Sequence, residues 1–235
     1  LGFDFTEFVE NLRLLEKKCN ISAIMSHFSS ADYLKSSKTK EQIKKFKAAT
    51  KNFAYDTSIA NSAGILGWTD SHLDWVRPGL ALYGISPFES ELTGYDFSPA
   101  MIFESEIISV RLMSKGDSIG YGGDFICPET MRIGLVGCGY GDGYPRKVSS
   151  DSEVFISGID RAPIIGRVSM DSLAIDLRGI DSAQIGNKVE LWGKTVRIED
   201  VAKCSGTIAN ELLTRVSQRV PRWAMNSSNL QTTET

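Results

Sequence analysis

One tyrosine of the sequence lies in an unusual run of small residues. Residues 118–125 read SIGYGGDF, so Tyr121 has Gly120 before it and Gly122 and Gly123 after it. Glycine lets the backbone adopt a positive φ and lets a second group approach closely. The run therefore fits either a hairpin turn that carries a surface tyrosine, or a phenol that reaches into a cavity formed by another chain.

Three polar residues follow strand-like segments earlier in the chain. His27 comes just after the apolar segment 21–25. Ser62 directly follows the segment 57–61, and Arg77 follows the next apolar pair. In βα folds, ligands bind beyond the carboxyl ends of the strands, and phosphate binds well where a helix begins. Each residue also has an ordinary interpretation, as a structural histidine, a helix cap and a surface ion pair. Together they indicate a site for a planar, phosphorylated ligand.

The first part of the chain must position these three residues. Asp4 is placed to cap a first helix, and the charged segment 39–50 predicts a second. The strand-like segments are 21–25, 57–61 and 75–84. Alternating strands and helices are typical of βα units on a parallel sheet. A closed (β/α)₈ barrel needs about 200–250 residues, so the first part of the chain forms either a small open α/β domain or a piece that begins partway round a barrel. The start, LGFDF, has no initiator methionine and favours the second, so we expect residues 1–97 to form the C-terminal portion of such a barrel.

The second part of the chain must position Tyr121. Glycine and aspartate separate its strand-like segments, which are 102–113, 132–141, 152–158, 162–170, 172–179, 188–193 and 195–200. This pattern predicts an all-β domain of short antiparallel strands over residues 98–225. One helix is expected near 207–218, and the polar residues 226–235 predict a disordered tail.

Composition excludes several classes of protein. The 235 residues are 42% apolar and 23% charged, with a net charge of −3, which is typical of a globular domain and gives no basis for nucleic-acid binding. No apolar run is long enough to span a bilayer, so we expect no membrane partner. The four cysteines are scattered and there are only two histidines, so we expect no metal site and free thiols in the cytoplasm.

Several segments together resemble the alanine racemase family. They read MSHFSSAD, ANSAGIL, HLDWVRPGLALYGISP, SIGYGGDF, GYGDGYPR and PIIGRVSMD, in the family's order and at compatible spacings over nearly the whole chain. The resemblance implies an enzyme with pyridoxal 5'-phosphate (PLP), an N-terminal (β/α)₈ barrel and a C-terminal β domain. It also implies a head-to-tail homodimer with shared active sites, L-alanine and D-alanine as substrates, and a role in D-alanine supply for peptidoglycan.

The resemblance gives catalytic roles to three residues. Tyr121 matches the family's catalytic tyrosine, which projects into the barrel of the other subunit and deprotonates the α-carbon of L-alanine. His27 and Arg77 would form its hydrogen-bonded neighbourhood, and a nearby cation favours the phenolate that a general base requires. Arg77 would face the pyridine nitrogen of PLP. A guanidinium cannot accept a proton, so the ring would stay unprotonated, which suits racemisation and suppresses transamination.

The resemblance also assigns the cofactor phosphate and the substrate. Ser62 and Asn61, with the backbone N–H groups of Gly79 and Leu80, would hold the phosphate. The family adds a tyrosine in a motif resembling TIxYE, but this chain reads TIANE and has Asn210 there. Two further residues match the family's substrate site: the backbone of Met170 would contact the substrate carboxylate, and Tyr140 would line the entrance. A packed β-domain tyrosine is the alternative for Tyr140.

Two family motifs have no counterpart in the sequence. The lysine that holds PLP lies in a stretch like KANAYG, and nothing here matches it. The family's substrate-carboxylate arginine lies in a motif like TGMxRLGF, whereas this chain opens at LGF without an initiator methionine. We therefore expect a C-terminal fragment that is inactive by itself.

Other functions fit parts of the pattern. A PLP-dependent decarboxylase of the same barrel class would place an acid at the ring nitrogen, and Arg77 argues against it. A racemase of another amino acid, such as serine or lysine, and a non-catalytic PLP-barrel protein remain alternatives. The upstream genomic sequence would separate a fragment from a non-enzyme.

Overall fold

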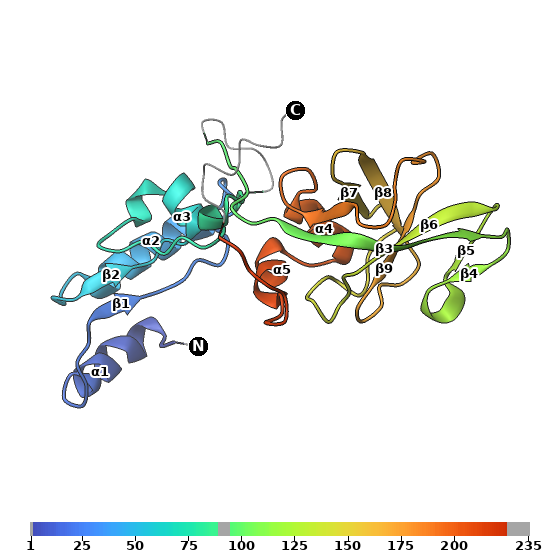
Figure 1. Ribbon diagram of the computed structural model, residues 1–235. Coiled ribbons are helices and arrows are strands. Elements are labelled where there is room, and N and C mark those ends of the chain that lie inside the picture. Colours follow the sequence, from blue (N-terminus) through green and yellow to red (C-terminus); the bar gives the residue numbers. More distant parts are fainter. Residues whose placement is uncertain (1, 89–94, 225–235) are drawn as a thin grey trace. The chain divides into compact units, whose positions relative to one another are not determined.

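The computed structural model of the chain divides into two compact units, Leu1–Ala100 and Met101–Thr235 (Figure 1). We call them the α/β unit and the β unit. The structure describes residues 2–88 and 95–224. The sequence prediction drew the boundary three residues earlier, after residue 97, and the tail predicted over 226–235 lies outside the described residues.

The α/β unit alternates short strands and helices, as the sequence predicts. Its elements are α1 (Phe5–Leu15), β1 (Ala23–Met25), α2 (Ser37–Thr50), β2 (Asp56–Ser58), α3 (Ser62–Gly67) and the 3₁₀ helices η1 (Thr69–Ser71) and η2 (Leu80–Tyr83). Strands β1 and β2 are parallel, with Ile24 opposite Thr57. Trp75 forms a further parallel bridge to Ser58, so three successive segments lie side by side.

Local sequence explains the ends of these elements. Asp4 caps α1, because its Oδ1 accepts hydrogen bonds from the N–H groups of Thr6 and Glu7, both at 2.8 Å. One apolar core then packs the two later helices against the strands. Its buried residues are Phe28, Ala31, Ile43, Ile59, Ala63, Trp68 and Phe88.

The prediction of a strand over residues 75–84 is wrong for the second half of this segment. Only Trp75 pairs with β2, and residues 80–83 form η2. Pro78 has no N–H to donate to a neighbouring strand. The next N–H groups, those of Gly79 and Ala81, both turn toward the Ser62 hydroxyl, at 2.8 and 3.2 Å. The chain therefore curls instead of extending.

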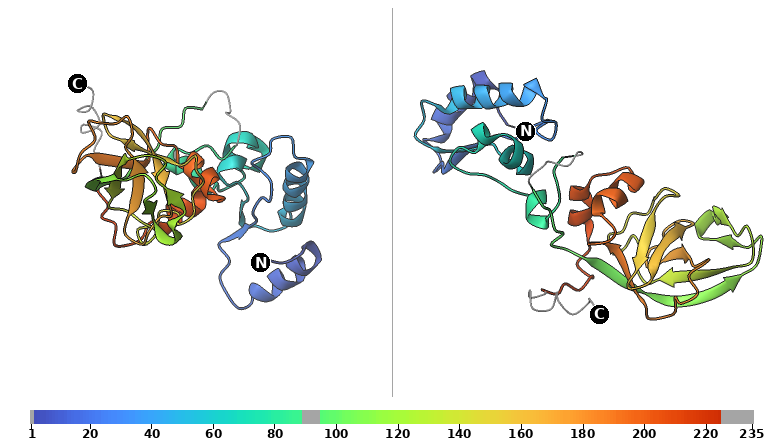
Figure 2. Two further views of the ribbon diagram at one scale, coloured as in Figure 1. Left: turned by 90° about the vertical axis from the view of Figure 1, so that its right-hand side faces the viewer. Right: turned by 90° about the horizontal axis from the view of Figure 1, so that it is seen from above.

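The β unit contains a closed six-stranded antiparallel barrel (Figures 1 and 2). Its elements are β3 (Phe103–Met113), β4 (Ser118–Ile119), the 3₁₀ helix η3 (Tyr121–Gly123), β5 (Phe125–Ile126), β6 (Met131–Val136), β7 (Glu153–Ile156), β8 (Asp160–Ile165), β9 (Leu173–Asp176), β10 (Lys188–Trp192), α4 (Ile198–Ser205) and α5 (Ala209–Arg215). The strand order is β10-β3-β6-β9-β8-β7, and β7 pairs back to β10. Closure removes the unpaired edges of a sheet.

The long strand β3 makes this closure possible. Its first residues pair with β10, and its later residues pair with β6, with a register shift between Ile107 and Ser109. Such a bulge bends a strand, so one strand can serve two sides of a barrel. Residues with no exposed surface then fill the interior, among them Val136, Val154, Ile156, Ile175, Val189 and Leu191.

Three sequence expectations for the β unit need correction. The segment 195–200 was expected as a strand, but α4 begins at Ile198, so the unit has two late helices where one was expected. Glu199 and Asp200 favour the start of this helix, and Gly206 ends it in the left-handed conformation. Strands β6 and β8 also end earlier than expected: the glycine-rich segment 137–143 follows β6, and Gly166, in the left-handed conformation, follows β8.

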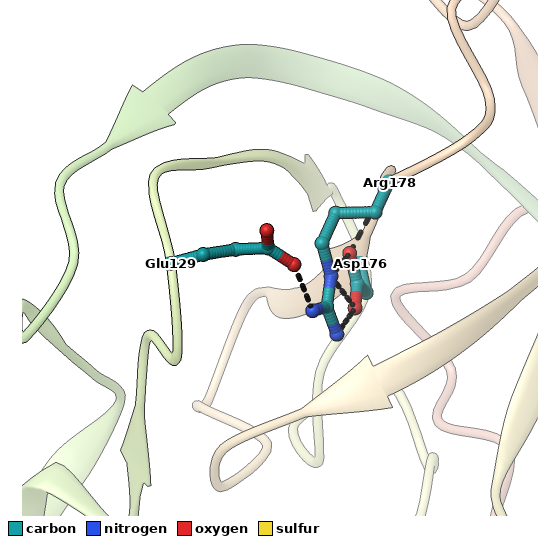
Figure 3. A network of polar contacts seen from close by, with 3 residues as sticks. All are labelled: Glu129, Asp176 and Arg178. Atoms are coloured by element: carbon teal, nitrogen blue, oxygen red, sulfur yellow. Dashed lines mark hydrogen bonds and ion pairs between the residues drawn. The ribbon is translucent and has the colours of Figure 1, made fainter.

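One ion-pair network fixes the end of β9 (Figure 3). Asp176 is buried, and its carboxylate accepts hydrogen bonds from Nε and Nη2 of Arg178 at 2.9 and 2.7 Å. Nη1 of the same arginine donates to Glu129 at 2.8 Å, on the loop after β5. A buried carboxylate needs such partners. Arg178 therefore ties that loop to the barrel.

The described ranges, 2–88 and 95–224, contain no helix that is long and apolar enough to cross a membrane. They also contain no group of three or more histidine, cysteine, aspartate or glutamate side chains that could hold a metal ion.

Candidate functional site

Arg77 lies at the carboxyl ends of β1 and β2, as the sequence predicts. Its Nη1 donates to the hydroxyl of Ser58 at 2.5 Å and its Nη2 to the carbonyl oxygen of Ser26 at 2.6 Å. Ser58 is the last residue of β2, and Ser26 follows β1. The guanidinium is half-buried, and no carboxylate pairs with it among the described residues. Two of its five N–H donors are used, so others remain for a ligand.

Ser62 is the first residue of α3, but it is not the helix cap. The preceding residue, Asn61, caps the helix by accepting a hydrogen bond from the N–H of Gly64 at 2.9 Å. The buried Ser62 hydroxyl instead accepts from the N–H groups of Gly79 and Ala81. Its own hydrogen has no acceptor among the described residues. A buried O–H donor without an acceptor suits an anionic group such as a phosphate.

The N–H of Leu80 adds a second donor to this corner. It follows Gly79 directly, and within the described ranges no acceptor is assigned to it. Gly79 has no side chain, and a Cβ built there would lie 4.0 Å from the Ser62 hydroxyl oxygen. Ser62, Gly79 and Leu80 therefore form a compact corner that fits the phosphate of PLP.

His27 is exposed on the loop after β1. Its carbonyl oxygen accepts a hydrogen bond from the amide of Gln42 in α2, at 3.3 Å. Arg77 binds the carbonyl of the preceding residue, Ser26, so His27 and Arg77 belong to one neighbourhood. The described part of the chain shows no hydrogen bond between the two side chains, so their expected direct contact stays a prediction.

Tyr121 lies at the tip of a small hairpin between β4 and β5. Its side chain is 67% exposed. Gly120 has φ +80°, and a Cβ there would lie 3.0 Å from the backbone nitrogen of Arg167. Asp124 and Arg167 form an ion pair that fastens the hairpin to the loop after β8. The glycines thus make a tight turn that also holds a phenol out into solvent.

Tyr140 and Met170 lie side by side on two adjoining loops of the β unit. The N–H of Tyr140 donates to the carbonyl of Ser169 at 3.0 Å, and the N–H of Gly141 donates to the carbonyl of Met170 at 2.8 Å. Tyr140 is 38% exposed and Met170 is 52% exposed. The alternative of a fully packed tyrosine therefore does not describe Tyr140.

Two residues that hold these loops were not predicted from the sequence. Asp142 accepts from the N–H of Gly139 at 2.9 Å and from Nε of Arg219 at 2.8 Å. Asp142 is part of the quoted GYGDGYPR, so its acidic side chain inside a glycine-rich loop was an available indication. Arg219 lies far along the chain, and the sequence alone gives no sign that it reaches this loop.

Comparison with known proteins gives the family. The family model described as alanine racemase, N-terminal domain, matches residues 1–87, and the model for the C-terminal domain of the same family matches residues 100–224. The chain belongs to the alanine racemase family. An alanine racemase of Pasteurella multocida is 44% identical over 217 residues, which are 92% of this chain and 60% of the relative.

Solved structures of the family have the same fold. The biosynthetic alanine racemase of Pseudomonas aeruginosa matches with a TM-score of 0.85 and 37% identity, over 96% of this chain and 64% of that chain. The alanine racemase of Bartonella henselae, solved with covalently bound pyridoxal phosphate, matches with a TM-score of 0.84 and 31% identity over 95% of this chain and 62% of that one. The expected fold, a partial barrel followed by a β-rich domain, is confirmed. The chain spans about 60% of the length of the curated relatives it matches.

The lysines of the α/β unit and Asn210 bear on two departures from the family pattern, the missing cofactor lysine and the replaced phosphate-binding tyrosine. The lysines of the α/β unit are all exposed, on or beside α1 and α2: Lys17, Lys18, Lys35, Lys38, Lys40, Lys44, Lys45, Lys47 and Lys51. None of them lies directly after the carboxyl end of β1 or β2. Asn210 is exposed in α5, and along the described ranges its side-chain amide makes no hydrogen bond. The residues present therefore fit the phosphate and the ring of PLP but not its covalent attachment.

Proposed function

We propose that this chain is part of a PLP-dependent alanine racemase, which interconverts L-alanine and D-alanine. The 44% identity to the Pasteurella multocida alanine racemase over 92% of the chain carries this proposal. The donors at the ends of the first strands support it. PLP, when bound, withdraws electrons from the α-carbon of the amino acid and makes its proton acidic.

The α/β unit would bind and orient the cofactor. Ser62 would donate its free O–H to the phosphate, together with the N–H of Leu80. The N–H of Gly79, which donates to the Ser62 hydroxyl, would hold that hydroxyl in place, and Asn61 caps the helix. Arg77 would donate to the pyridine nitrogen from its position between Ser26 and Ser58. Because a guanidinium gives no proton to the ring, the electron withdrawal stays moderate.

The β unit would supply the base for one face of the substrate. Tyr121 would take the α-proton of L-alanine, with His27 and Arg77 near its oxygen. We infer that this tyrosine comes from the second subunit of a homodimer, because its side chain is exposed at the tip of a hairpin. Met170 and Tyr140 would orient the substrate carboxylate and line the entrance. The base for the opposite face would be a lysine outside this chain.

The cellular role follows from the proposed reaction. D-Alanine is a building block of peptidoglycan, so we propose a cytoplasmic enzyme that supplies cell-wall synthesis. The substrates would be the two enantiomers of alanine.

The test uses a full-length chimaera. In this chimaera, the segment of the Pasteurella multocida relative that lies before the matched region is fused to residue 1 of this chain. The purified chimaera with PLP should convert L-alanine to D-alanine, measured by circular dichroism and by a D-amino-acid oxidase assay. Chimaeras with Ser62→Ala and Arg77→Ala should lose activity, whereas Ser37→Ala, at the exposed first position of α2, is the control.

The same assay separates the alternatives. Among alanine, serine and lysine, alanine should have the highest kcat/KM. A higher kcat/KM for serine or lysine would mean that this amino acid, and not alanine, is the substrate. Release of CO₂ would indicate a decarboxylase. PLP binding without any turnover would support a non-catalytic protein.

A further inference from the structure

Arg219 joins two loops of the β unit through two carboxylates. It follows α5, and its Nε donates to Asp142 at 2.8 Å while its Nη2 donates to Asp171 at 2.7 Å. The side chain of Asp142 is only 18% exposed, whereas that of Asp171 is 67% exposed. The hydrogen bonds that the guanidinium donates, first to Asp142 and then to Asp171, raise its pKa above the ordinary value. The arginine therefore stays charged and paired to both loops.

The two joined loops are those that carry Tyr140 and Met170. Backbone hydrogen bonds already link them, from the N–H of Tyr140 to Ser169 and from the N–H of Gly141 to Met170. The side chain of Arg219 links the same two loops a second time. Its Nη2 also lies 3.5 Å from the carbonyl oxygen of Met170.

Two glycines leave the space that this arrangement needs. A Cβ at position 141 would lie 2.5 Å from Nη2 of Arg219. A Cβ at position 139 would lie 2.3 Å from the carbonyl oxygen of Ser169. Any larger residue at either position would force the loops or the guanidinium apart. The glycine spacing of GCGYGDGYPR thus serves close packing of two loops beneath one arginine.

We propose that Arg219 is a positioning residue that holds the Tyr140 loop and the Met170 loop in register for the substrate. The inference deepens the proposed function and rests on it, since the roles of Tyr140 and Met170 toward alanine come from there. A guanidinium is a rigid planar fork that can bind two carboxylates in fixed directions, which the flexible ammonium of lysine cannot reproduce. Positioning groups of this kind act through the residues they orient.

A second arginine of the β unit provides a matched control. Arg178 also binds two carboxylates, Asp176 and Glu129 (Figure 3). Its partners lie at the end of β9 and after β5, and neither loop carries Tyr140 or Met170. Changing Arg178 also removes two ion pairs from the β unit, but it leaves the contacts between the Tyr140 loop and the Met170 loop in place. Arg215, whose one ion-pair partner among the described residues is Glu211 within α5, is a milder control.

The first measurement is hydrogen exchange on the chain itself. Arg219→Met should lower the protection of the Tyr140 and Gly141 amides by about tenfold, because each charge-assisted bond contributes on the scale of a tenfold equilibrium change. The Ile133 amide in β6 should be unaffected. Arg178→Met and Arg215→Met should leave the Tyr140 and Gly141 amides as protected as in the wild type.

The second measurement is the kinetics of the full-length chimaera. Arg219→Met should raise KM for alanine by about tenfold and change kcat by less than about threefold, because misplaced loops weaken binding of the substrate carboxylate more than the proton transfer. Arg219→Lys should recover only part of the change. Asp171→Asn breaks one half of the link at an exposed residue, so it should fold normally and give a smaller rise in KM.

These outcomes separate the inference from the proposed function. Unchanged exchange at Tyr140 and Gly141 in folded Arg219→Met, or an unchanged KM in an active chimaera, would overturn the positioning role. If Arg219→Met does not fold, Asp171→Asn decides in its place by the same two measurements. An inactive wild-type chimaera would instead count against the proposed function, and exchange alone would then decide whether Arg219 holds the two loops.

Discussion

The two units of the chain solve the problem of strand edges differently. In the β unit, each of the six barrel strands pairs on both sides, so the described barrel presents no free edge. In the α/β unit, β1 pairs only with β2, and its other side has no partner strand among residues 2–88 and 95–224. A row of unpaired N–H and C=O groups is a liability that proteins normally cover.

The exposure of the strand side chains differs between the two units in the same way. Met25 at the end of β1 is 62% exposed, and Trp75, which bridges to β2, is 60% exposed. Residues at the corresponding places in the barrel, such as Ile175 of β9 and Val189 of β10, have no exposed surface. The β unit thus closes its own barrel. In the α/β unit, the strand ends that carry the site lie beside an unpaired edge of β1.

The largest expected effect tests whether Tyr121 of the β unit acts as a catalytic base. In the full-length chimaera, Tyr121→Phe should slow racemisation by about 10²–10⁴-fold, because it removes one of two bases that act on opposite faces of the α-carbon. Exchange of the α-proton with deuterium should fall sharply from L-alanine and persist from D-alanine. Tyr33→Phe, at an exposed tyrosine of the α/β unit, should have no effect.

Mixing subunits then tests whether that tyrosine acts across the dimer. Subunits with Tyr121→Phe are combined with subunits whose cofactor lysine, in the relative's segment, is changed to alanine. Mixed dimers should have one intact site and regain part of the activity. Confirmed mixed dimers that stay inactive would show that each subunit uses its own tyrosine.

The next effect concerns stability. Ile175→Ala in the β unit and Ile59→Ala in the α/β unit each remove a side chain with no exposed surface. Each should destabilise its own unit by about 2–5 kcal/mol, as core truncations do. Trp192 and Trp68 report on the two cores, so urea unfolding followed by fluorescence should show two transitions, the α/β unit first.

Exposed residues provide the control for this pair. Leu112→Ala and Leu82→Ala, at side chains that are 70% and 68% exposed, should change neither transition by more than about 0.5 kcal/mol. One cooperative transition that both core variants shift equally would contradict the contrast between the units.

A smaller effect concerns the binding of the PLP phosphate. In the chimaera, Ser62→Ala should weaken PLP binding by about 1.5–3 kcal/mol, the range for a hydrogen bond to a charged group. Asn210→Tyr should strengthen binding by a regained hydroxyl contact of similar type. The two changes should be non-additive if they act on one phosphate, and fluorescence titration with PLP measures this. A dissociation constant that Asn210→Tyr leaves unchanged would mean that another group already fills the position.

The smallest effect contrasts a buried and an exposed thiol. Burial raises the pKa of Cys138 in the β unit from its ordinary 9.0 to about 12. A thiol whose pKa is higher in the folded chain binds its proton more tightly there. Its contribution to stability is therefore complete below pH 9 and is lost as the pH rises toward 12. At pH 10 the loss should be about 1.4 kcal/mol.

Urea unfolding at pH 7 to 10 checks this dependence. Cys138→Ala should flatten the decline of the β-unit transition above pH 9, and Cys19→Ala, which removes an exposed thiol of the α/β unit, is the control. In the native protein a thiol reagent should label Cys19 and spare Cys138. An equal decline in the wild type and in Cys138→Ala would show that the thiol does not titrate as inferred.

The sequence predicts most of the elements, and the failures have physical causes. Asp4 and the apolar positions of α1 and α2 act locally, so pattern and capping suffice for those helices. The segment 195–200 alternates like a strand, yet α4 begins there, and Ile198, Val201 and Ala202 are buried along one face of this helix. The curl at 80–83 depends on the Ser62 hydroxyl, which lies 17 residues away from Gly79.

For the site, the sequence by itself determined the residue types and their order. His27, Ser62, Arg77 and Tyr121 stand in motifs that are sufficient to indicate the family, because each motif is a short run of residues whose types and order do not depend on the fold. Only the tertiary structure decided which donors are free and which are used: Asn61 caps α3, and that leaves the Ser62 hydroxyl available. It also revealed Arg219, because a contact between residues 77 positions apart in the chain leaves no trace in local sequence.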